Sequence, residues 1–370
     1  MTERDYKIWL NHLSKMRIMR KHILLEILGS AEAVAELGPG DVGHLEERGT
    51  LTPAEAEELV KDRPEEWLKK HNAKLDQLGV AVMVEGDPLY PTQLGFIPDP
   101  PICLYYKGSP ELLLQPSMAV IGSRTPSLYG RETAGHFASH LAASGVVIVS
   151  GLAAGIDSEA HRAALTAGGS TIGVLGCGVE QCYPKENYGL YDRMCREGLV
   201  ISEYEPGTNP YPANFPMRNR IISGLSRGVL VTEARRKSGT MITADAALEQ
   251  GRSVYAVPGR IMDPLSAGTN HLIKDAARLA ESPEEILDEL FPELTKQGKK
   301  KREELTDEEA AILQLFSLEP MFMDDVIRKG RRGIAETISI LQSLKKKRRI
   351  RETLPGYYIL ETKIYSKRKN

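Results

Sequence analysis

No stretch of this sequence reaches the roughly 18 consecutive apolar residues that a membrane-spanning helix requires, and charged side chains interrupt the first twenty residues throughout. We therefore expect a cytoplasmic protein that does not enter a membrane. Cysteine is scarce, with four in 370 residues (Cys103, Cys177, Cys182 and Cys195), and none forms a C-x-x-C pair. This spacing argues against a disulfide framework and a zinc site, and leaves a redox or metal pair of Cys177 and Cys182 as a minor alternative.

Two glycine-rich fingerprints of nucleotide-binding proteins are also missing. No G-x-G-x-x-G follows the first strand expected in the central region, which disfavours NAD, and no G-x-x-x-x-G-K-[ST] occurs, which removes a P-loop. We therefore expect no cofactor and no metal ion.

The small net charge of −2 hides an uneven distribution. Residues 296–370 contain 19 Lys and Arg against 11 Asp and Glu, a local charge of +8, so residues 1–295 sum to −10. A basic end suggests an anionic partner, although such ends are often only solvated and screened by salt.

Apolar periodicity predicts a small helical domain at residues 1–80. Apolar residues at helical spacing over 18–28 stop at Gly29-Ser30, and a helical pattern resumes over 31–37. This arrangement resembles SAM-like and helix-hairpin-helix modules, and a simple helical packing domain is an equally open interpretation.

The rest of the chain divides into three further parts. Residues 81–290 predict a connector with one or two strands, followed by a Rossmann-like domain, and the polar residues 291–306 predict a linker. Residues 307–362 predict a winged helix, because three helical patterns precede two short strands around Pro355-Gly356.

Strand-like apolar runs alternate with helical patterns through the central region. The runs are 118–122, 146–151, 171–176, 199–203, 228–234 and 253–259. This alternation is typical of the α/β class with a doubly wound, mostly parallel sheet. Ligands of such sheets collect beyond the carboxyl ends of the strands, so the residues after each run are candidates for binding.

Gly, Ser, Thr and Arg recur at those positions. The segments are 122–127, 150–155, 237–240, and 259 with 266–270. Glycine allows close approach of the backbone to an anion, and helix N-termini direct N–H groups and a positive dipole end at it. Four converging loops predict a phosphate track, whereas any single glycine could simply make a turn.

Cations and aromatic rings lie in the same loops, namely Arg124, Lys185, Arg218 and Arg220 with Tyr183 and Phe215. Arg and Lys are the usual phosphate partners, and unpaired bases stack on aromatic rings. An alternative is that Arg218 and Arg220 form structural ion pairs with Glu203 or Glu233.

Asp157 and His161 are four residues apart at an expected helix start and so share one face. A metal site would need a third ligand that the sequence does not place. An aspartate at the start of a helix needs no ligand, so we interpret the pair as structural.

These motifs resemble the DNA-processing protein A (DprA, or Smf) family. The matching segments are VIGSR at 120–124, VSGLAAGID at 149–157, VLG at 174–176, YPKEN at 183–187, FPMRNRIISGLS at 215–226, and 238–259 from SGT to VPG. The match covers about residues 85 to 280. Met241 stands where a leucine is common, and Gln181 and Cys182 lie where the family loop varies.

The resemblance implies a non-enzymatic protein that binds and protects single-stranded DNA, loads the RecA recombinase in natural transformation and recombination, and forms a homodimer. Transferred position by position, it implies these DNA-binding residues: Gly122, Ser123, Arg124, Lys185, Asn187, Phe215, Arg218, Asn219, Arg220, Ser238, Gly239 and Thr240.

Two other functions stay open. Glu233 with residues 238–240 resembles the arrangement of nucleotide phosphoribohydrolases, although their Pro-Gly-Gly-x-Gly-Thr pattern is missing. Alternatively, the expected winged helix, with its basic run at 345–349, binds duplex DNA through a helix over 334–344 or contacts a protein.

Overall fold

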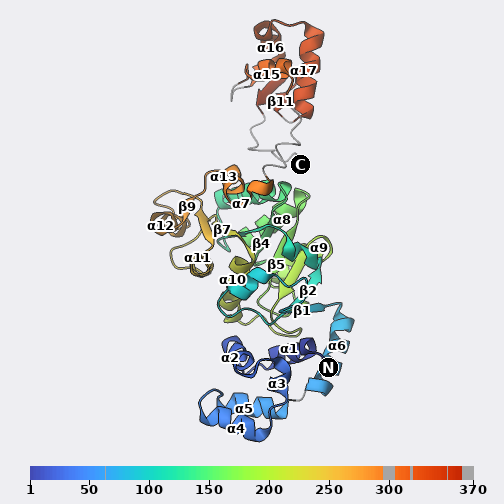
Figure 1. Ribbon diagram of the computed structural model, residues 1–370. Coiled ribbons are helices and arrows are strands. Elements are labelled where there is room, and N and C mark those ends of the chain that lie inside the picture. Colours follow the sequence, from blue (N-terminus) through green and yellow to red (C-terminus); the bar gives the residue numbers. More distant parts are fainter. Residues whose placement is uncertain (63, 295–304, 317–319, 348, 361–370) are drawn as a thin grey trace. The chain divides into compact units, whose positions relative to one another are not determined.

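The computed structural model describes the chain except residues 63, 295–304, 317–319, 348 and 361–370. The chain divides into two compact units, Met1–Thr295 and Lys296–Asn370 (Figure 1). Most of the linker expected at 291–306 lies outside the described residues. Phe291, its first residue, is fully buried in a cluster with Phe137 and Ile286, so the first unit extends past residue 290.

The first unit begins with six helices, as the helical periodicity predicts. They are α1 (Glu3–His12), α2 (Ile18–Leu28), α3 (Ala31–Ala35), α4 (Pro39–Glu47), α5 (Pro53–Lys61) and α6 (Pro64–Leu78). Their starts follow capping rules, since Thr52 and Glu55 form a capping box ahead of Pro53 at the start of α5. The apolar faces of these helices bury Trp9 and Leu24 together with Ile102 beside the sheet.

A nine-stranded sheet forms the centre of this unit. Its strands are β1 (Ala81–Val84), β2 (Cys103–Gly108), β3 (Ser117–Ile121), β4 (Val147–Ser150), β5 (Thr171–Val174), β6 (Leu199–Ser202), β7 (Gly228–Val231), β8 (Ser253–Ala256) and β9 (Arg278–Leu279). The order is β1-β2-β6-β5-β4-β3-β7-β8-β9. Pairing is parallel from β6 to β9 and antiparallel in β1–β2 and β2–β6, so the predicted mostly parallel α/β fold is confirmed.

Helices cover both faces of the sheet (Figure 1). They are α7 (Leu128–Ala143), α8 (Ile156–Thr166), α9 (Tyr188–Glu197), α10 (Asn214–Leu225), α11 (Gly239–Glu249), α12 (Ala267–Asp275) and α13 (Pro283–Leu290). In β3, Met118 and Val120 pack with α7, α8 and α13, whereas Ala119 and Ile121 pack with α10 and α11. Burial of both faces explains why the strands are apolar runs rather than alternating patterns.

The second unit is a small winged helix, as predicted. It contains α15 (Asp307–Leu313), β10 (Met321–Phe322), α16 (Met323–Gly330), α17 (Ile334–Lys346), β11 (Ile350–Leu354) and β12 (Tyr357–Leu360). The strand order is β10-β12-β11, and Val326, Leu341 and Ile350 form the core. Across the described parts of both units, no helix combines the length and apolar character of a membrane span.

Candidate nucleic-acid interface

A pocket in the first unit lies where the sheet reverses its winding direction. Strand β3 pairs with β4 on one side and with β7 on the other, so the loops after β3 and β7 diverge at their carboxyl ends. This is the topological switch point at which open α/β sheets bind ligands. The pocket has a volume of about 490 Å³, in the range of small-molecule sites.

The loops after β3 and β7 are joined by hydrogen bonds at the pocket floor. The Ser123 amide donates to the Glu233 carbonyl at 2.8 Å, and Oγ1 of Thr240 donates to the Gly122 carbonyl at 3.0 Å. No side chain caps α11, because Oγ of Ser238 donates to the Arg235 carbonyl instead. The N-terminus of α11 therefore presents its amides and positive dipole end at the pocket.

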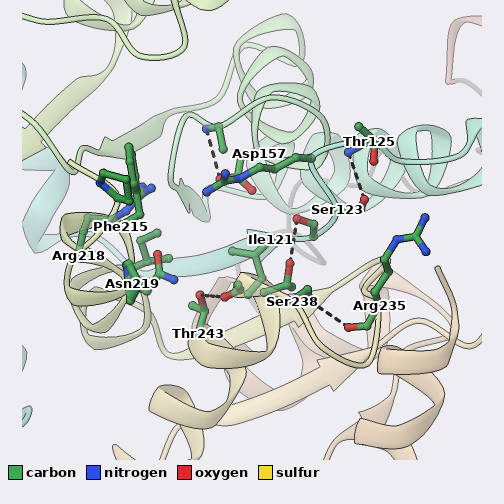
Figure 2. A pocket seen from close by; sticks show the side chains of 18 of the residues that line it. Ile121, Ser123, Thr125, Asp157, Phe215, Arg218, Asn219, Arg235, Ser238 and Thr243 are labelled. Atoms are coloured by element: carbon green, nitrogen blue, oxygen red, sulfur yellow. Dashed lines mark hydrogen bonds between the residues drawn. The ribbon is translucent and has the colours of Figure 1, made fainter. Parts of the chain in front are cut away.

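Helix α10 supplies the opposite wall. Figure 2 shows Phe215, Arg218 and Asn219 from this helix on one side of the hollow, across from Ser123 and Ser238. Arg218 is only 4% exposed, and its Nη1 donates to the Val174 carbonyl. Its Nε has no hydrogen-bond partner among the described residues, so one donor of a buried cation is unsatisfied.

The charge of Arg218 persists despite its burial. Desolvation lowers the pKa of Arg218 to about 10, although Asp157 opposes this shift, so the guanidinium is a cation at neutral pH. Burial also disfavours the charged form of Asp157 and so raises its pKa, although Arg218 and two backbone amides lower that pKa in part. The Asp157 carboxylate accepts from the amides of Gly151 at 3.0 Å and Ala153 at 3.4 Å, which holds the loop after β4.

Phe215 forms the centre of an aromatic and cationic group at the mouth of the pocket. The guanidinium carbons of Arg124 and Arg218 lie 5.8 Å and 6.0 Å from its ring centroid. The ring of Tyr183 lies 5.4 Å from it, tilted by 34°. Both Arg124 and Tyr183 are exposed, so these groups can contact a ligand that continues beyond the pocket.

Nine of the twelve residues that the resemblance implies line this pocket. They are Gly122, Ser123, Arg124, Phe215, Arg218, Asn219, Ser238, Gly239 and Thr240. They come from three segments, 122–124, 215–219 and 238–240, and the first and last of these are more than 100 residues apart, so the fold itself brings them together.

The other three residues lie outside the pocket. Arg220 is buried in an ion pair with Glu203, with Nη1 3.0 Å and Nη2 2.5 Å from its two oxygens, so the structural alternative applies to it. Asn187 is buried and donates to the Leu152 carbonyl at 2.9 Å. Lys185 is exposed and lines a separate hollow with Gln181, Cys182 and Tyr188.

The expected convergence of four glycine-rich loops is wrong in one respect. Gly259 and residues 266–270 follow β8, one strand further from the switch point, and none of them lines the pocket. The loop after β4 contributes only Ala153, because its glycines pack against protein. A Cβ at Gly151 would lie 2.2 Å from Nη1 of Arg218, and Gly155, with φ of 82°, lies against the backbone of Ser123.

Several residues of the pocket were not among the candidates from the sequence. They include Arg235, Thr243, Pro210 and Pro212. Arg235 lies four residues after the end of β7 and opens the basic run 235–237, so the rule for strand ends was sufficient to find it. The two prolines lie on a loop whose path is set by tertiary contacts, and no local signal identifies them.

Two titratable groups that could suggest other chemistry, Glu233 and His161, have structural partners. Glu233 is buried and accepts from the amide and the hydroxyl of Ser127 at the start of α7. His161 is buried with its Nδ1 2.6 Å from Oγ1 of Thr171, and burial with Arg218 and Arg162 lowers its pKa to about 3. Within the described residues, no group of three or more His, Cys, Asp or Glu could hold a metal ion.

The fold and pocket define a Rossmann-like α/β protein with a cationic binding site at its switch point and without the dinucleotide fingerprint. Comparison with known proteins identifies the family. Residues 81–291 match the model described as DNA recombination-mediator protein A. The chain belongs to this family, as the sequence motifs predicted.

Individual relatives agree with this assignment. The DNA processing protein DprA of Streptococcus pneumoniae is 42% identical over 285 residues, covering 77% of this chain and 98% of the relative. A solved structure of that protein gives a TM-score of 0.68 at 40% identity, covering 78% of this chain and 98% of the other. A solved structure of DNA processing protein A from Helicobacter pylori gives a TM-score of 0.53 at 31% identity, covering 58% of this chain and 96% of the other.

Proposed function

We propose that the pocket binds single-stranded DNA and that the chain, without catalysing a reaction itself, holds this DNA for the RecA recombinase. The observation that carries the proposal is Arg218, a buried cation with an unsatisfied donor at the pocket, beside the uncapped N-terminus of α11. The amides at this N-terminus can donate to a phosphate group, and the buried positive charge of Arg218 attracts it. The Helicobacter pylori relative is described for its single-stranded DNA binding mode, which supports the same ligand.

The surroundings of the pocket favour a polymer over a free nucleotide. Arg235 lines the pocket, and Arg236 and Lys237 extend the same exposed basic run, which suits further phosphates of the same strand. Phe215 and Tyr183 offer ring faces to unpaired bases, which a paired duplex would not expose. Such stacking tolerates most sequences.

The phosphoribohydrolase alternative lacks its carboxylate. Glu233, the candidate acid, is committed to the start of α7 through Ser127 and does not line the pocket. A binding role without turnover therefore fits the side chains better. Release of free base from nucleotides, measured with the full chain, would contradict this part of the proposal.

The direct test is fluorescence anisotropy of a labelled oligothymidine with the full chain at two salt concentrations. We expect affinity that falls with salt and exceeds that for duplex of equal length. Arg124→Ala should weaken binding and reduce the salt slope by about 0.7, the value for one phosphate contact on a single strand. The control is Arg196→Ala, which removes an exposed arginine paired with Asp192 on α9, away from the pocket residues. Preference for duplex, or unchanged affinity in Arg124→Ala, would overturn the pocket assignment.

As a mediator in natural transformation and recombination, the chain would have two partners. One is RecA, and the other is a second copy of this chain in a homodimer. A coupled assay tests the mediator role: RecA ATPase activity on single strands already coated with a single-strand-binding protein. We expect the wild-type chain to shorten the lag of this reaction and Arg124→Ala to lose the effect. An unchanged lag with the wild-type chain would exclude the loading role while leaving DNA binding intact.

A further inference from the structure

The loop between β6 and α10, residues 203–213, connects the N-terminal helices to the pocket. At its C-terminal end, Pro210 and Pro212 line the pocket, and the chain passes directly into α10, which carries Phe215 and Arg218. The position of this loop therefore sets the position of one pocket wall.

The N-terminal end of the same loop is held by the helices of residues 1–80. Glu205 accepts from two histidines: Nδ1 of His12 on α1 lies 2.7 Å from its Oε2, and Nδ1 of His71 on α6 lies 3.3 Å from its Oε1. Nζ of Lys74 donates to the Pro206 carbonyl at 2.5 Å. Three side chains from two helices thus fix two consecutive residues of the loop.

Packing and hydrogen bonds restrict the orientation of both histidines. Trp67 is stacked between them, with ring centroids 4.3 Å from His12 and 4.4 Å from His71. Nε2 of His71 lies 3.3 Å from the hydroxyl of Tyr105 on β2, and Nε2 of His12 lies 3.4 Å from Asp62. This packing leaves the histidines little freedom, so they can hold Glu205 in one place.

The middle of the loop is held by residues 178 and 180. The amide of Gly207 donates to Oε1 of Glu180 at 2.7 Å, and the Thr208 carbonyl accepts from the amide of Gly178 at 2.9 Å. These contacts run from the clamped end to within two residues of Pro210. The segment is therefore ordered along its length, rather than only at its ends.

We infer that the N-terminal helices act as a support for the DNA pocket, and that Glu205, clamped by His12 and His71, is a positioning residue for DNA binding. The inference rests on the proposed function. Without the clamp, the loop and the start of α10 would sample other positions, and part of the binding free energy would be used to order them again. The coupling is reciprocal, so DNA in the pocket also tightens the attachment of the helices.

The test compares variants of the full chain in the oligothymidine anisotropy assay. Glu205→Gln keeps the shape of the side chain but removes its charge, and we expect about fivefold weaker binding, the lower end of typical coupling effects. The salt slope should stay at the wild-type value, because no phosphate contact is removed, whereas Arg124→Ala lowers it. Should Glu205→Gln fail to fold, Lys74→Ala, which removes one contact from the adjacent residue, replaces it.

Lys7→Ala is the matched control. Nζ of Lys7, also on α1, donates to the Glu85 carbonyl at 2.8 Å and so joins the same helices to the β1 side of the sheet without touching the loop. We expect wild-type affinity for this variant. Equal losses in Lys7→Ala and Glu205→Gln would mean that general loosening of the helices is responsible, which would overturn the inference.

A second measurement follows the reciprocal effect. The chain has two tryptophans, so Trp9→Phe leaves Trp67, between the two histidines, as the single indole reporter. Adding oligothymidine should change its emission, and Glu205→Gln in the same background should reduce that change. Failure of the proposed function and failure of the support role give different results. A wild-type chain that does not bind oligothymidine contradicts the proposed function. Normal binding by wild type and Glu205→Gln, with loss in Arg124→Ala, contradicts only the support role.

Discussion

Arg218 has almost no access to solvent, and the aspartate that opposes the lowering of its pKa, Asp157, is itself buried. Burial of a cation with an unsatisfied N–H costs stability. Strained or unsatisfied groups of this kind cluster at functional sites, where a ligand completes them. On the proposed function, an anion of the DNA supplies the charge partner in this pocket, and the arginine is held in place before the DNA arrives.

Substitution of Gly151 tests how strongly DNA affinity and stability depend on the position of Arg218. A Cβ at this position would lie 2.2 Å from Nη1 of Arg218, inside any allowed contact, so Gly151→Ala must displace the guanidinium. We expect oligothymidine affinity to fall about tenfold and the thermal midpoint to fall with it, as overpacking costs about 1–3 kcal/mol. Anisotropy and thermal unfolding monitored by circular dichroism measure the two effects.

Gly239→Ala is the control for the same pocket. A Cβ there meets nothing within 4 Å, and the residue is the first of α11, where alanine is a better helix former. This variant should be as stable as the wild type or slightly more stable. If both glycine variants behave alike, the close contact with Arg218 does not set the pocket.

Side-chain direction explains which candidate residues were misplaced. The sequence around Phe215 predicts a loop in which Arg218 and Arg220 are equivalent, but the structure has α10 beginning at Asn214. Residues two apart on a helix point about 200° from each other, so Arg218 lines the pocket while Arg220 meets Glu203. The sequence identified both arginines as cations, but their positions on the helix determine which one lines the pocket.

At the scale of elements, the strands were more predictable than the loops. Every run predicted as a strand in the central region is a strand, because burial on both faces requires a continuous apolar segment. Strand β9, Arg278–Leu279, was not predicted, since two exposed residues carry no pattern. The loop after β8 was wrongly included in the site because strand order, unlike strand identity, depends on contacts that are distant in sequence.

Helix α15 provides a prediction on pH. Hydrogen bonds from Lys347 and Ser343 lower the pKa of Glu309 to about 2, from an ordinary value of 4.5. A carboxylate with a depressed pKa in the folded state contributes stability above its unfolded pKa and loses it as the pH falls through the folded value. We therefore expect the winged helix to lose stability between about pH 5 and about pH 2, and Glu309→Gln to remove this part of the pH dependence.

Thermal unfolding followed at several pH values in this range measures the effect on the C-terminal unit. Glu308→Gln is the control, because its exposed carboxylate only approaches Arg332 at 3.8 Å. A Glu309→Gln variant with the same pH profile as the wild type would show that the ion pair with Lys347 does not contribute.

The whole molecule consists of two units of opposite charge. Residues 1–295 carry −10 and contain the proposed DNA pocket, whereas residues 296–370 carry +8 and form the winged helix. Charge alone would assign DNA binding to the basic unit. We propose the acidic unit instead, because local cations at the switch point matter more to a bound phosphate than the distant net charge.

Calorimetry of the full chain distinguishes these assignments. We expect two unfolding transitions, and a saturating oligothymidine should raise only the transition of the unit Met1–Thr295, since a ligand stabilises the unit that binds it. At about one hundred times the dissociation constant the gain is about 2.7 kcal/mol. Val326→Ala, in the core of the winged helix, identifies the second transition by lowering it alone.

A shift of the second transition on adding oligothymidine would assign single-strand binding to the winged helix. A shift of that transition with duplex alone would instead support the alternative that this unit contacts double-stranded DNA. The same calorimetric scans give either result, because Val326→Ala identifies which transition belongs to the winged helix.

The pairing of β3 with β7 also determines when the central sheet can form during synthesis of the chain. Ala119 pairs with Val229, so the central pair of the sheet joins residues that leave the ribosome 110 positions apart. Until β7 emerges, β3 is an apolar edge strand with one side unpaired, and such edges are sites of aggregation. Since the pocket needs residues up to Thr243, a nascent chain acquires its proposed binding site only after Thr243 has been synthesised.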